Sequence, residues 1–201
     1  MNKKKTIITV GVISIIGLAL LVGLDQWTKQ LAVQHLAGQP DIILIKDILV
    51  LQYLENTGAA FGLLKNKGWI FIVFTVIFLL FGGYLFVKTP KAKRYAPLHI
   101  IVVFLLAGAI GNLIDRVLHA YVIDFIYFVP INFPIFNVAD MYVTVSAVIL
   151  MLLIGFYYKD EDFTFLNKQS EVPDNDMTET KEESDINDKA ETCDKETTRE
   201  N

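Results

Sequence analysis

The chain has 201 residues, of which 53% are hydrophobic, and its mean hydropathy is +0.45. This composition is too apolar for an ordinary soluble domain. The net charge of −4 averages two different regions, because residues 159–201 carry a net charge of −9 and residues 1–158 carry +5. The only cysteine, Cys193, lies in the acidic region, which excludes an intramolecular disulfide and a cysteine-based metal site in the apolar region.

Four uncharged apolar runs predict four transmembrane helices, since each is about as long as a helix needs to cross ~30 Å of hydrocarbon. The runs are Thr6–Leu24, Gly68–Val87, Tyr95–Ile114 and Met141–Tyr158. The first run follows three lysines and could instead be a cleaved signal peptide. It is longer than the usual apolar segment of such a peptide, and no small-x-small cleavage site closes it. We therefore expect a retained span and an all-α membrane domain over residues 1–158.

The segment between the first two spans is too long for a simple turn. Within it, Ile42–Ile45 and Leu49–Leu54 are apolar runs of strand-forming residues, separated by Lys46 and Asp47. This pattern predicts a small hairpin or sheet at the membrane surface. The small residues Gly58–Ala60 follow it and favour a close approach of the backbone to another group.

Lysine and arginine residues near the span ends predict the orientation of the chain, because cytoplasmic loops are enriched in both. Three lysines precede the first span, and four basic residues crowd the short connection between the second and third spans. The basic residues of the opposite side are spread over longer loops. We therefore expect both termini to be cytoplasmic and the acidic residues at the opposite span ends to face outward.

The segment between the third and fourth spans, Phe125–Ala139, is uncharged and rich in phenylalanine. Pro130 and Pro134 exclude a continuous helix there. The segment could anchor the chain in the membrane surface, or it could form a wall of an apolar substrate site, and the two interpretations are compatible. Residues 159–201, by contrast, hold too few apolar side chains to offset the entropy of ordering, so we expect a disordered cytoplasmic tail.

Asp124 and Asp140 are the strongest candidates for catalysis. Asp124 follows the third span and Asp140 opens the fourth, and the outer ends of two consecutive antiparallel helices can be neighbours. Two carboxylates a few ångströms apart do not ionise together easily, so one can act as a base towards water and the other as an acid. The alternative is structural, with Asp140 as a helix-capping residue and Asp124 in a loop.

Other polar residues gather near the same face. Asn112, Asp115 and Arg116 are spaced i, i+3, i+4 on one helix face. Because a neighbouring arginine favours the ionised carboxylate, we expect Asp115 to be structural or to bind other groups rather than to act as an acid. Asn112 and Asn137 could orient water or substrate amides.

Asp25 ends the first apolar run, and ionisable groups at membrane depth are candidates for a functional site. Lys29 follows four residues later. The simplest interpretation of the two is an exposed ion pair at the end of a helix.

Several other chemistries fit the sequence less well. The three histidines, His35, His99 and His119, are too scattered for a metal site. The serines before the tail have no histidine nearby in sequence, and no Gly-x-x-x-x-Gly-Lys phosphate loop occurs. The basic residues form no aromatic-interleaved patch, so we expect no nucleic-acid partner.

Taken together, these motifs resemble the lipoprotein signal peptidases (signal peptidase II). Five sequence blocks of that family occur here in order: Asp25-Gln26-x-Thr28-Lys29, Asn56-Thr57-Gly58-Ala59-Ala60-Phe61, Gly108-Ala109-x-Gly111-Asn112-x-x-Asp115-Arg116, Val122-Ile123-Asp124-Phe125 and Phe136-Asn137-x-Ala139-Asp140. One block would be weak, but five at matching span positions are specific. The resemblance covers about residues 7–158 and does not include the acidic tail.

The resemblance implies an aspartic endopeptidase of the bacterial cytoplasmic membrane, which removes signal peptides from prolipoproteins by cutting before a diacylglyceryl-modified cysteine. Its catalytic residues correspond to Asp124 and Asp140. Positions that bind substrate or support the site correspond to Asp25, Asn56, Gly108, Asn112, Asp115, Arg116, Asn137 and Ala139. The resemblance further implies a surface β-cradle at Asp41–Asn56, no metal or cofactor, inhibition by globomycin-type peptides, contact with membrane lipid and a monomeric state.

Two other classes of function remain open at this stage. A proton-coupled transporter also uses intramembrane carboxylates, but usually near the midplane of larger, repeated bundles. A non-catalytic membrane assembly factor would tolerate the replacement of Asp124 and Asp140 by asparagine. Cleavage of a modified substrate by the purified protein and by those two variants separates the three.

Overall fold

The computed structural model describes residues 3–58 and 68–167. The chain divides into two compact units, Met1–Phe165 and Leu166–Asn201. The second unit is described only as far as Asn167, and the four long helices and the three strands belong to the first unit. The residues Ala59–Phe61, which include part of the stretch expected to allow close backbone approach, lie outside the described residues.

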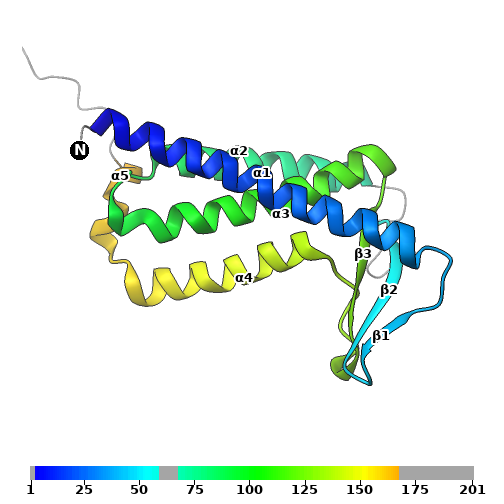
Figure 1. Ribbon diagram of the computed structural model, residues 1–201. Helices are drawn as coiled ribbons and strands as arrows, with labels where there is room; N and C mark the ends of the chain where they lie inside the picture. Colours follow the sequence, from blue (N-terminus) through cyan, green and yellow to red (C-terminus); the bar gives the residue numbers. More distant parts are fainter. Residues whose placement is uncertain (1–2, 59–67, 168–201) are drawn as a thin grey trace, which may run out of the picture. The chain divides into compact units, whose positions relative to one another are not determined.

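Four long helices make up most of the first unit (Figure 1). They are α1 (Lys3–Leu36), α2 (Gly68–Lys88), α3 (Ala96–His119) and α4 (Val138–Leu152), and a π-helical turn, Leu153–Tyr157, continues α4. All four are long and apolar enough to cross a membrane, which confirms the four predicted spans. Helix α3 packs against each of the other three and therefore lies at the centre of the bundle.

Helix α1 is longer than the sequence predicts. The apolar run ends at Leu24, but the helix continues for about three further turns to Leu36. It continues because the charged side chains that follow the run, Asp25 and Lys29, are buried against other helices instead of facing water. Beyond them, Ala32 and Leu36 join a small apolar core with Ile123 and Phe125, which fixes this end of α1 to the sheet.

A three-stranded antiparallel sheet stands at one end of the bundle, with the strand order β1-β2-β3 (Figure 1). Strands β1 (Ile42–Ile45) and β2 (Leu49–Asn56) form the predicted hairpin, which is therefore confirmed. The third strand, β3 (Val122–Phe128), is not predicted by the sequence. It pairs along β2 with Leu54 opposite Asp124 and Asn56 opposite Val122.

The two prolines of the Phe125–Ala139 segment lie after the strand instead of interrupting it. Pro130 belongs to a short 3₁₀ turn, Val129–Ile131, where its missing N–H leaves no donor unpaired. The chain then returns, and Phe136 pairs with Ile126 as an isolated bridge before α4 begins. The first part of the segment, where the sequence predicts no strand, thus belongs to the strand that positions Asp124.

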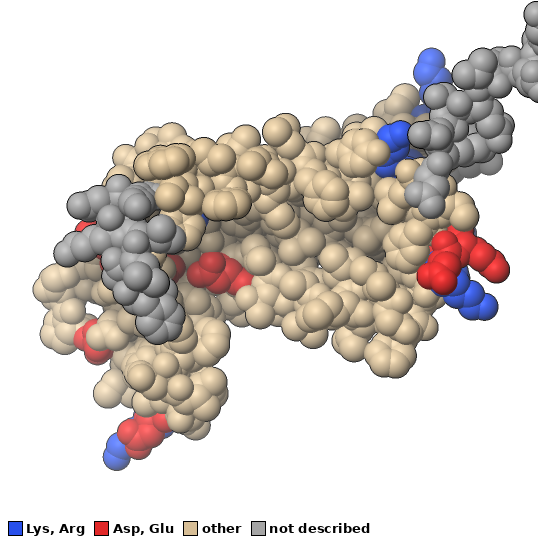
Figure 2. Space-filling view, turned by 180° about the vertical axis from the view of Figure 1, so that it is seen from behind, with Lys and Arg blue, Asp and Glu red and all other residues tan. Residues whose placement is uncertain are grey.

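Charged side chains on the face shown in Figure 2 lie towards the two ends of the helices, and the surface between them is uncharged. Large apolar side chains such as Ile13, Phe81 and Met151 are more than half exposed along the helices. Such an apolar belt is too large for a protein surrounded by water and is typical of a membrane-spanning bundle.

The region after Tyr158 is partly ordered in helical turns. A 3₁₀ turn, Asp160–Phe163, is followed by the short helix α5 (Thr164–Asn167). The turn is held by Asp162, which pairs with the guanidinium of Arg94 in the 3₁₀ turn just before α3. The expectation of a disordered tail from residue 159 onward is therefore wrong for these first turns. Residues 168–201 lie outside the described residues, and their disorder stays a prediction.

Candidate active site

Asp124 and Asp140 come from different elements and line the same cavity. Asp124 lies on β3, whereas Asp140 lies in the first turn of α4. The cavity has a volume of about 660 Å³. Its charged and amide-bearing lining residues are Asn56, Asn112, Arg116, Asp124 and Asp140. The prediction that the two acids come together is thus met in geometry, although Asp124 is in a strand and not in a loop.

The Asp124 carboxylate is almost fully buried, with 1% of its surface exposed. The Asn137 amide donates to its Oδ1 over 2.6 Å, and the Asn56 amide donates to its Oδ2 over 2.8 Å. Burial, together with the nearby Asp140 carboxylate, raises the pKa of Asp124 to about 6, although the two amides and the Lys29 ammonium partly oppose the shift. A carboxyl group with a pKa near neutral pH is suited to carrying and releasing a proton.

Asp140 takes part in the N-terminal cap of its own helix, where Asn137 is the capping residue, and also faces the cavity. Its backbone N–H donates to Asn137 Oδ1 over 2.9 Å, and its Oδ2 accepts from the Asn137 backbone N–H over 3.2 Å. This reciprocal pair is a capping box. The other oxygen, Oδ1, accepts from the Asn112 amide over 2.7 Å. Oδ2 of Asp140 therefore belongs to the helix cap of the structural interpretation, whereas Oδ1 is the oxygen to which the functional interpretation applies.

Two asparagine amides connect the carboxylates. Asn137 Nδ2 donates both to Asp124 Oδ1 and, over 3.1 Å, to Asn112 Oδ1. Asn112 Oδ1 also accepts from Lys29 Nζ over 2.9 Å. Because an ammonium group only donates, Lys29 fixes the Asn112 amide with its oxygen inward and its NH₂ group towards Asp140.

Lys29 lies at the centre of a buried ion cluster behind the cavity. Its Nζ is 2.9 Å from Asp25 Oδ2 and 2.9 Å from Asp115 Oδ2, and the three side chains are 0–2% exposed. Gln26 adds a hydrogen bond of 3.0 Å to Asp115 Oδ1 and one of 3.1 Å to the Gly111 carbonyl. The expected exposed pair of Asp25 and Lys29 is therefore wrong, because the pair faces α3 and not water.

The two acids of this cluster each hold the residue that precedes a cavity carboxylate. Asp115 Oδ2 accepts from the Ile123 N–H over 3.1 Å, next to Asp124. Asp25 Oδ1 accepts from the Ala139 N–H over 2.9 Å, next to Asp140. Since Lys29 binds both acids, a buried cation sets the positions of β3 and α4 relative to each other.

Arg116 does not serve as the partner of Asp115. Among the described residues, the ion pair of Asp115 is with Lys29. The Arg116 guanidinium instead lines the cavity, donates to the Asn112 carbonyl over 3.3 Å and lies 5.3 Å from the centre of the Phe71 ring. The prediction that Asp115 is structural fits its contacts, but the cation responsible comes from α1.

Two glycines of α3 allow its close contact with α4 and α1. A Cβ atom at Gly108 would lie 2.5 Å from the Ala139 carbonyl oxygen. A Cβ atom at Gly111 would collide with the Asp25 carboxylate. Gly108 also lines the cavity, whereas Ala139 is fully buried and packs against Gly108. The predicted site positions Gly108 and Ala139 therefore bring the carboxylate-bearing helix close to α3.

Sequence reasoning missed Gln26 and Lys29 as members of the site. Both stand in the first matching block, but a lysine four residues after an aspartate is also common on exposed helices. The signal that could have found them is the position of the pair directly after an apolar run, where a continued helix would bury both.

The comparison with known proteins agrees with this geometry. A family profile described as signal peptidase (SPase) II matches residues 16–156. The chain belongs to the signal peptidase II family. The matched range of this signal peptidase II chain includes the whole buried cluster and both cavity carboxylates, and the family predicted from the sequence blocks is confirmed.

Individual relatives support the same assignment. The chain is 38% identical over 149 residues to a lipoprotein signal peptidase of Streptococcus pyogenes serotype M1, covering 74% of this chain and 95% of the relative. It is 40% identical over 134 residues to the lipoprotein signal peptidase of Brevibacillus brevis, covering 67% and 89%. A solved bacterial membrane enzyme is 30% identical, with a TM-score of 0.62 over 80% of this chain and 94% of that one.

Proposed function

We propose that this signal peptidase II chain is an aspartic endopeptidase, which removes the signal peptide of prolipoproteins by cutting before a diacylglyceryl-modified cysteine. The peptidase activity follows from the family, and the aspartic mechanism is supported by one observation. Two carboxylates from different elements, Asp124 and Asp140, line one cavity and are linked through Asn112 and Asn137. The transporter and the assembly factor are not favoured, because the family is one of peptidases.

In the proposed reaction, Asp140 is the base and Asp124 the acid. Asp140 removes a proton from a water molecule as its oxygen attacks the scissile carbonyl carbon, and Asp124 gives its proton to the carbonyl oxygen. The resulting gem-diol collapses when Asp124 takes a proton back and Asp140 protonates the leaving nitrogen, so the C–N bond breaks and both carboxyl groups regain their starting state. The assignment of Asp124 as acid rests on its raised pKa of about 6.

The neighbouring residues support this reaction without exchanging protons. The amides of Asn56 and Asn137 hold Asp124, and the amide of Asn112 holds Asp140. Such preorganised donors lower the barrier because they need not reorient during the reaction. Arg116, which lines the same cavity, is placed to bind a carbonyl oxygen of the substrate peptide.

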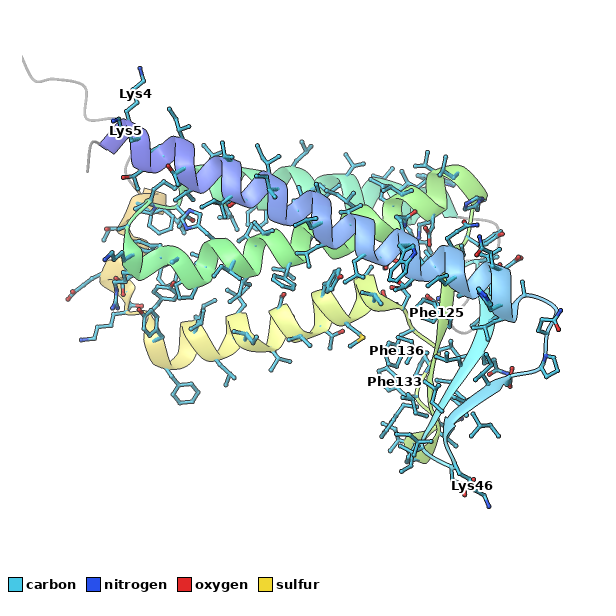
Figure 3. All side chains as sticks on the ribbon, viewed as in Figure 1. Lys4, Lys5, Lys46, Phe125, Phe133 and Phe136 are labelled. Atoms are coloured by element: carbon cyan, nitrogen blue, oxygen red, sulfur yellow. The ribbon has the colours of Figure 1, made fainter. Side chains whose placement is uncertain are left out.

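The apolar half of the cavity suits the lipid-modified cysteine. Phe133, Pro134 and Phe136 form one wall beside the sheet, and Val143 and Val145 of α4 form another. In Figure 3, Phe133 and Phe136 lie where the chain returns from β3 towards α4. We infer that the acyl chains lie against these side chains, and that globomycin-type peptides occupy the same cavity of a monomeric enzyme.

We place the cavity at the outer face of the cytoplasmic membrane. The sheet end of the bundle is opposite the end with Lys4 and Lys5 (Figure 3) and the connection from α2 to α3. That connection carries Lys88, Lys91, Lys93 and Arg94 within seven residues. By the enrichment of basic residues on the cytoplasmic side, both termini are inside and the carboxylates outside.

The test is cleavage of a synthetic prolipoprotein substrate by the purified protein, with the new N-terminus identified by mass spectrometry. The diacylglyceryl-modified substrate should be cut before its cysteine, and the unmodified one should not. Asp124→Asn and Asp140→Asn should each lose cleavage, whereas Asp47→Asn should not, because Asp47 is exposed in the hairpin turn at a φ of 58° that asparagine also tolerates. Normal cleavage by folded Asp124→Asn or Asp140→Asn would contradict the proposal.

A further inference from the structure

Two adjoining cavities lie at the end of the bundle opposite the sheet. One is an apolar groove of about 540 Å³ between α1 and α3, which runs along α1 from Thr6 to Leu21. The other has a volume of about 600 Å³ and lies between the start of α1 and the connection that follows α2. Both cavities include Thr6, Lys91 and Ala92, so they meet at this edge.

The groove has the length and lining of a site for an acyl chain. At 1.5 Å per residue, its α1 side is about 22 Å long, more than the ~15 Å of one hydrocarbon leaflet. Its walls are mainly aliphatic, and the small residues Ser14 and Gly17 leave the space between the helices. A Cβ atom at Gly17 would meet only Val103 Cγ1, at 4.0 Å.

The adjoining cavity has a basic character. Lys88 and Lys91 line it, and Lys93 lines the groove near the edge where the two cavities meet. The described residues that line either cavity include no acidic residue. The acidic residues of this end that the structure describes are those of the turn Asp160–Phe163, where Asp162 already pairs with Arg94.

Three backbone carbonyl groups at the end of α2 accept hydrogen bonds from side chains of the connection that follows. Lys91 Nζ donates to the Phe86 and Thr89 carbonyls, and the Leu85 carbonyl accepts from the Thr89 hydroxyl over 2.7 Å. The third contact of Lys91 Nζ is with His99 Nε2 at 2.9 Å, and burial lowers the pKa of Lys91, so this side chain is engaged within the protein. The exposed Lys88 and Lys93 remain as the side chains able to reach a bound anion.

We propose that these two cavities together bind one anionic phospholipid from the leaflet at this end of the bundle. One acyl chain occupies the groove between α1 and α3, and the phosphodiester lies at Lys88 and Lys93. Apolar grooves between transmembrane helices that end in basic side chains are typical sites for acidic lipid head groups. The site is separate from the cavity of Asp124 and Asp140, and its lipid is not the substrate.

Native mass spectrometry of the full-length protein tests the proposal. The delipidated protein is titrated with phosphatidylglycerol and with phosphatidylcholine of the same acyl chains, and bound lipids are counted. The wild type should retain one phosphatidylglycerol in preference to phosphatidylcholine. Replacing Lys88 and Lys93 by glutamine should lower the phosphatidylglycerol affinity about 25-fold, at about fivefold per lysine. Lys46→Gln, at the far tip of the sheet (Figure 3), should change nothing.

A second variant locates the acyl chain. Gly17→Leu fills the groove and should abolish retention of the lipid, while cleavage of the peptidase substrate, at the other end of the molecule, stays at the wild-type rate and reports an intact fold. Equal retention of the two lipids by the wild type would overturn the proposal. So would an unchanged preference in the double lysine variant, or full retention by Gly17→Leu, because lipid then binds elsewhere.

Discussion

Replacing Lys29 by methionine removes the buried cation that links β3, which carries Asp124, to α4, which carries Asp140. Methionine has a similar length but no charge, so it leaves Asp25 and Asp115 buried without their shared partner. Lys29 Nζ makes three contacts of 2.9 Å, with these two carboxylates and with Asn112 Oδ1. Removing one partner of a buried ion pair typically destabilises a protein by ~3–5 kcal/mol.

The same change should slow the reaction. Without Lys29, Asn112 Oδ1 keeps only the donor from Asn137, so the amide that holds Asp140 is less firmly oriented. A charge-assisted hydrogen bond contributes about 1.5–3 kcal/mol, and loss of that much transition-state stabilisation lowers kcat about 10- to 150-fold. KM should change little, because Lys29 is buried behind the cavity and does not line it.

The assay combines thermal unfolding in detergent with steady-state cleavage of the modified substrate. Lys46→Met is the matched control, since Lys46 is exposed at the tip of the hairpin. The variant Lys29→Met should show a lower Tm and a lower kcat, and the control should show neither. A folded Lys29→Met protein with the wild-type kcat would refute the role of Lys29 in orienting Asn112, and an unchanged Tm would refute its role in the ion cluster.

Three further predictions concern the site and the tail. Because burial raises the pKa of Asp124 to about 6, the protonated form that donates is populated mainly below that pH. The value of kcat/KM should therefore fall as the pH rises from 6 to 8. A flat pH profile would contradict the role of Asp124 as the acid. Gly108→Ala should lower stability by ~1–3 kcal/mol in thermal unfolding, because its Cβ meets the Ala139 carbonyl, whereas Gly83→Ala, with nothing within 4 Å, should not. Deletion of residues 168–201 should leave cleavage at the wild-type rate. In the full-length protein, Cys193 should react with an impermeant thiol reagent only from the cytoplasmic side of sealed vesicles. Labelling from outside would reverse the proposed orientation.

The sequence predicts the features that depend on composition along the chain. Uncharged runs of membrane-spanning length identify four helices, and the spacing of two strand-forming runs identifies the hairpin of β1 and β2. The carboxylates at the ends of the third and fourth spans are predicted as a pair because antiparallel neighbours bring such ends together. These inferences need only local pattern and the direction of the chain.

The features that the sequence does not predict depend on contacts between distant segments. Strand β3 is specified by its pairing with β2, and its own residues are equally typical of an apolar membrane anchor. The extension of α1 beyond Leu24 requires that Asp25 and Lys29 find partners on α3 and α4, which no local pattern reveals. For the same reason the sequence pairs Asp115 with its neighbour Arg116 instead of with Lys29.

The central claim is that Asp124 and Asp140 act as one catalytic unit, and the rate of the double variant tests it most directly. Single-turnover cleavage of the modified substrate should be ~10²–10⁴-fold slower for Asp124→Asn and for Asp140→Asn. Because loss of either member disables the pair, the variant with both changes should be about as slow as the slower single variant. If the two losses instead multiply in the double variant, or if either folded single variant cleaves at the wild-type rate, the two carboxylates do not act as a pair and the account is contradicted.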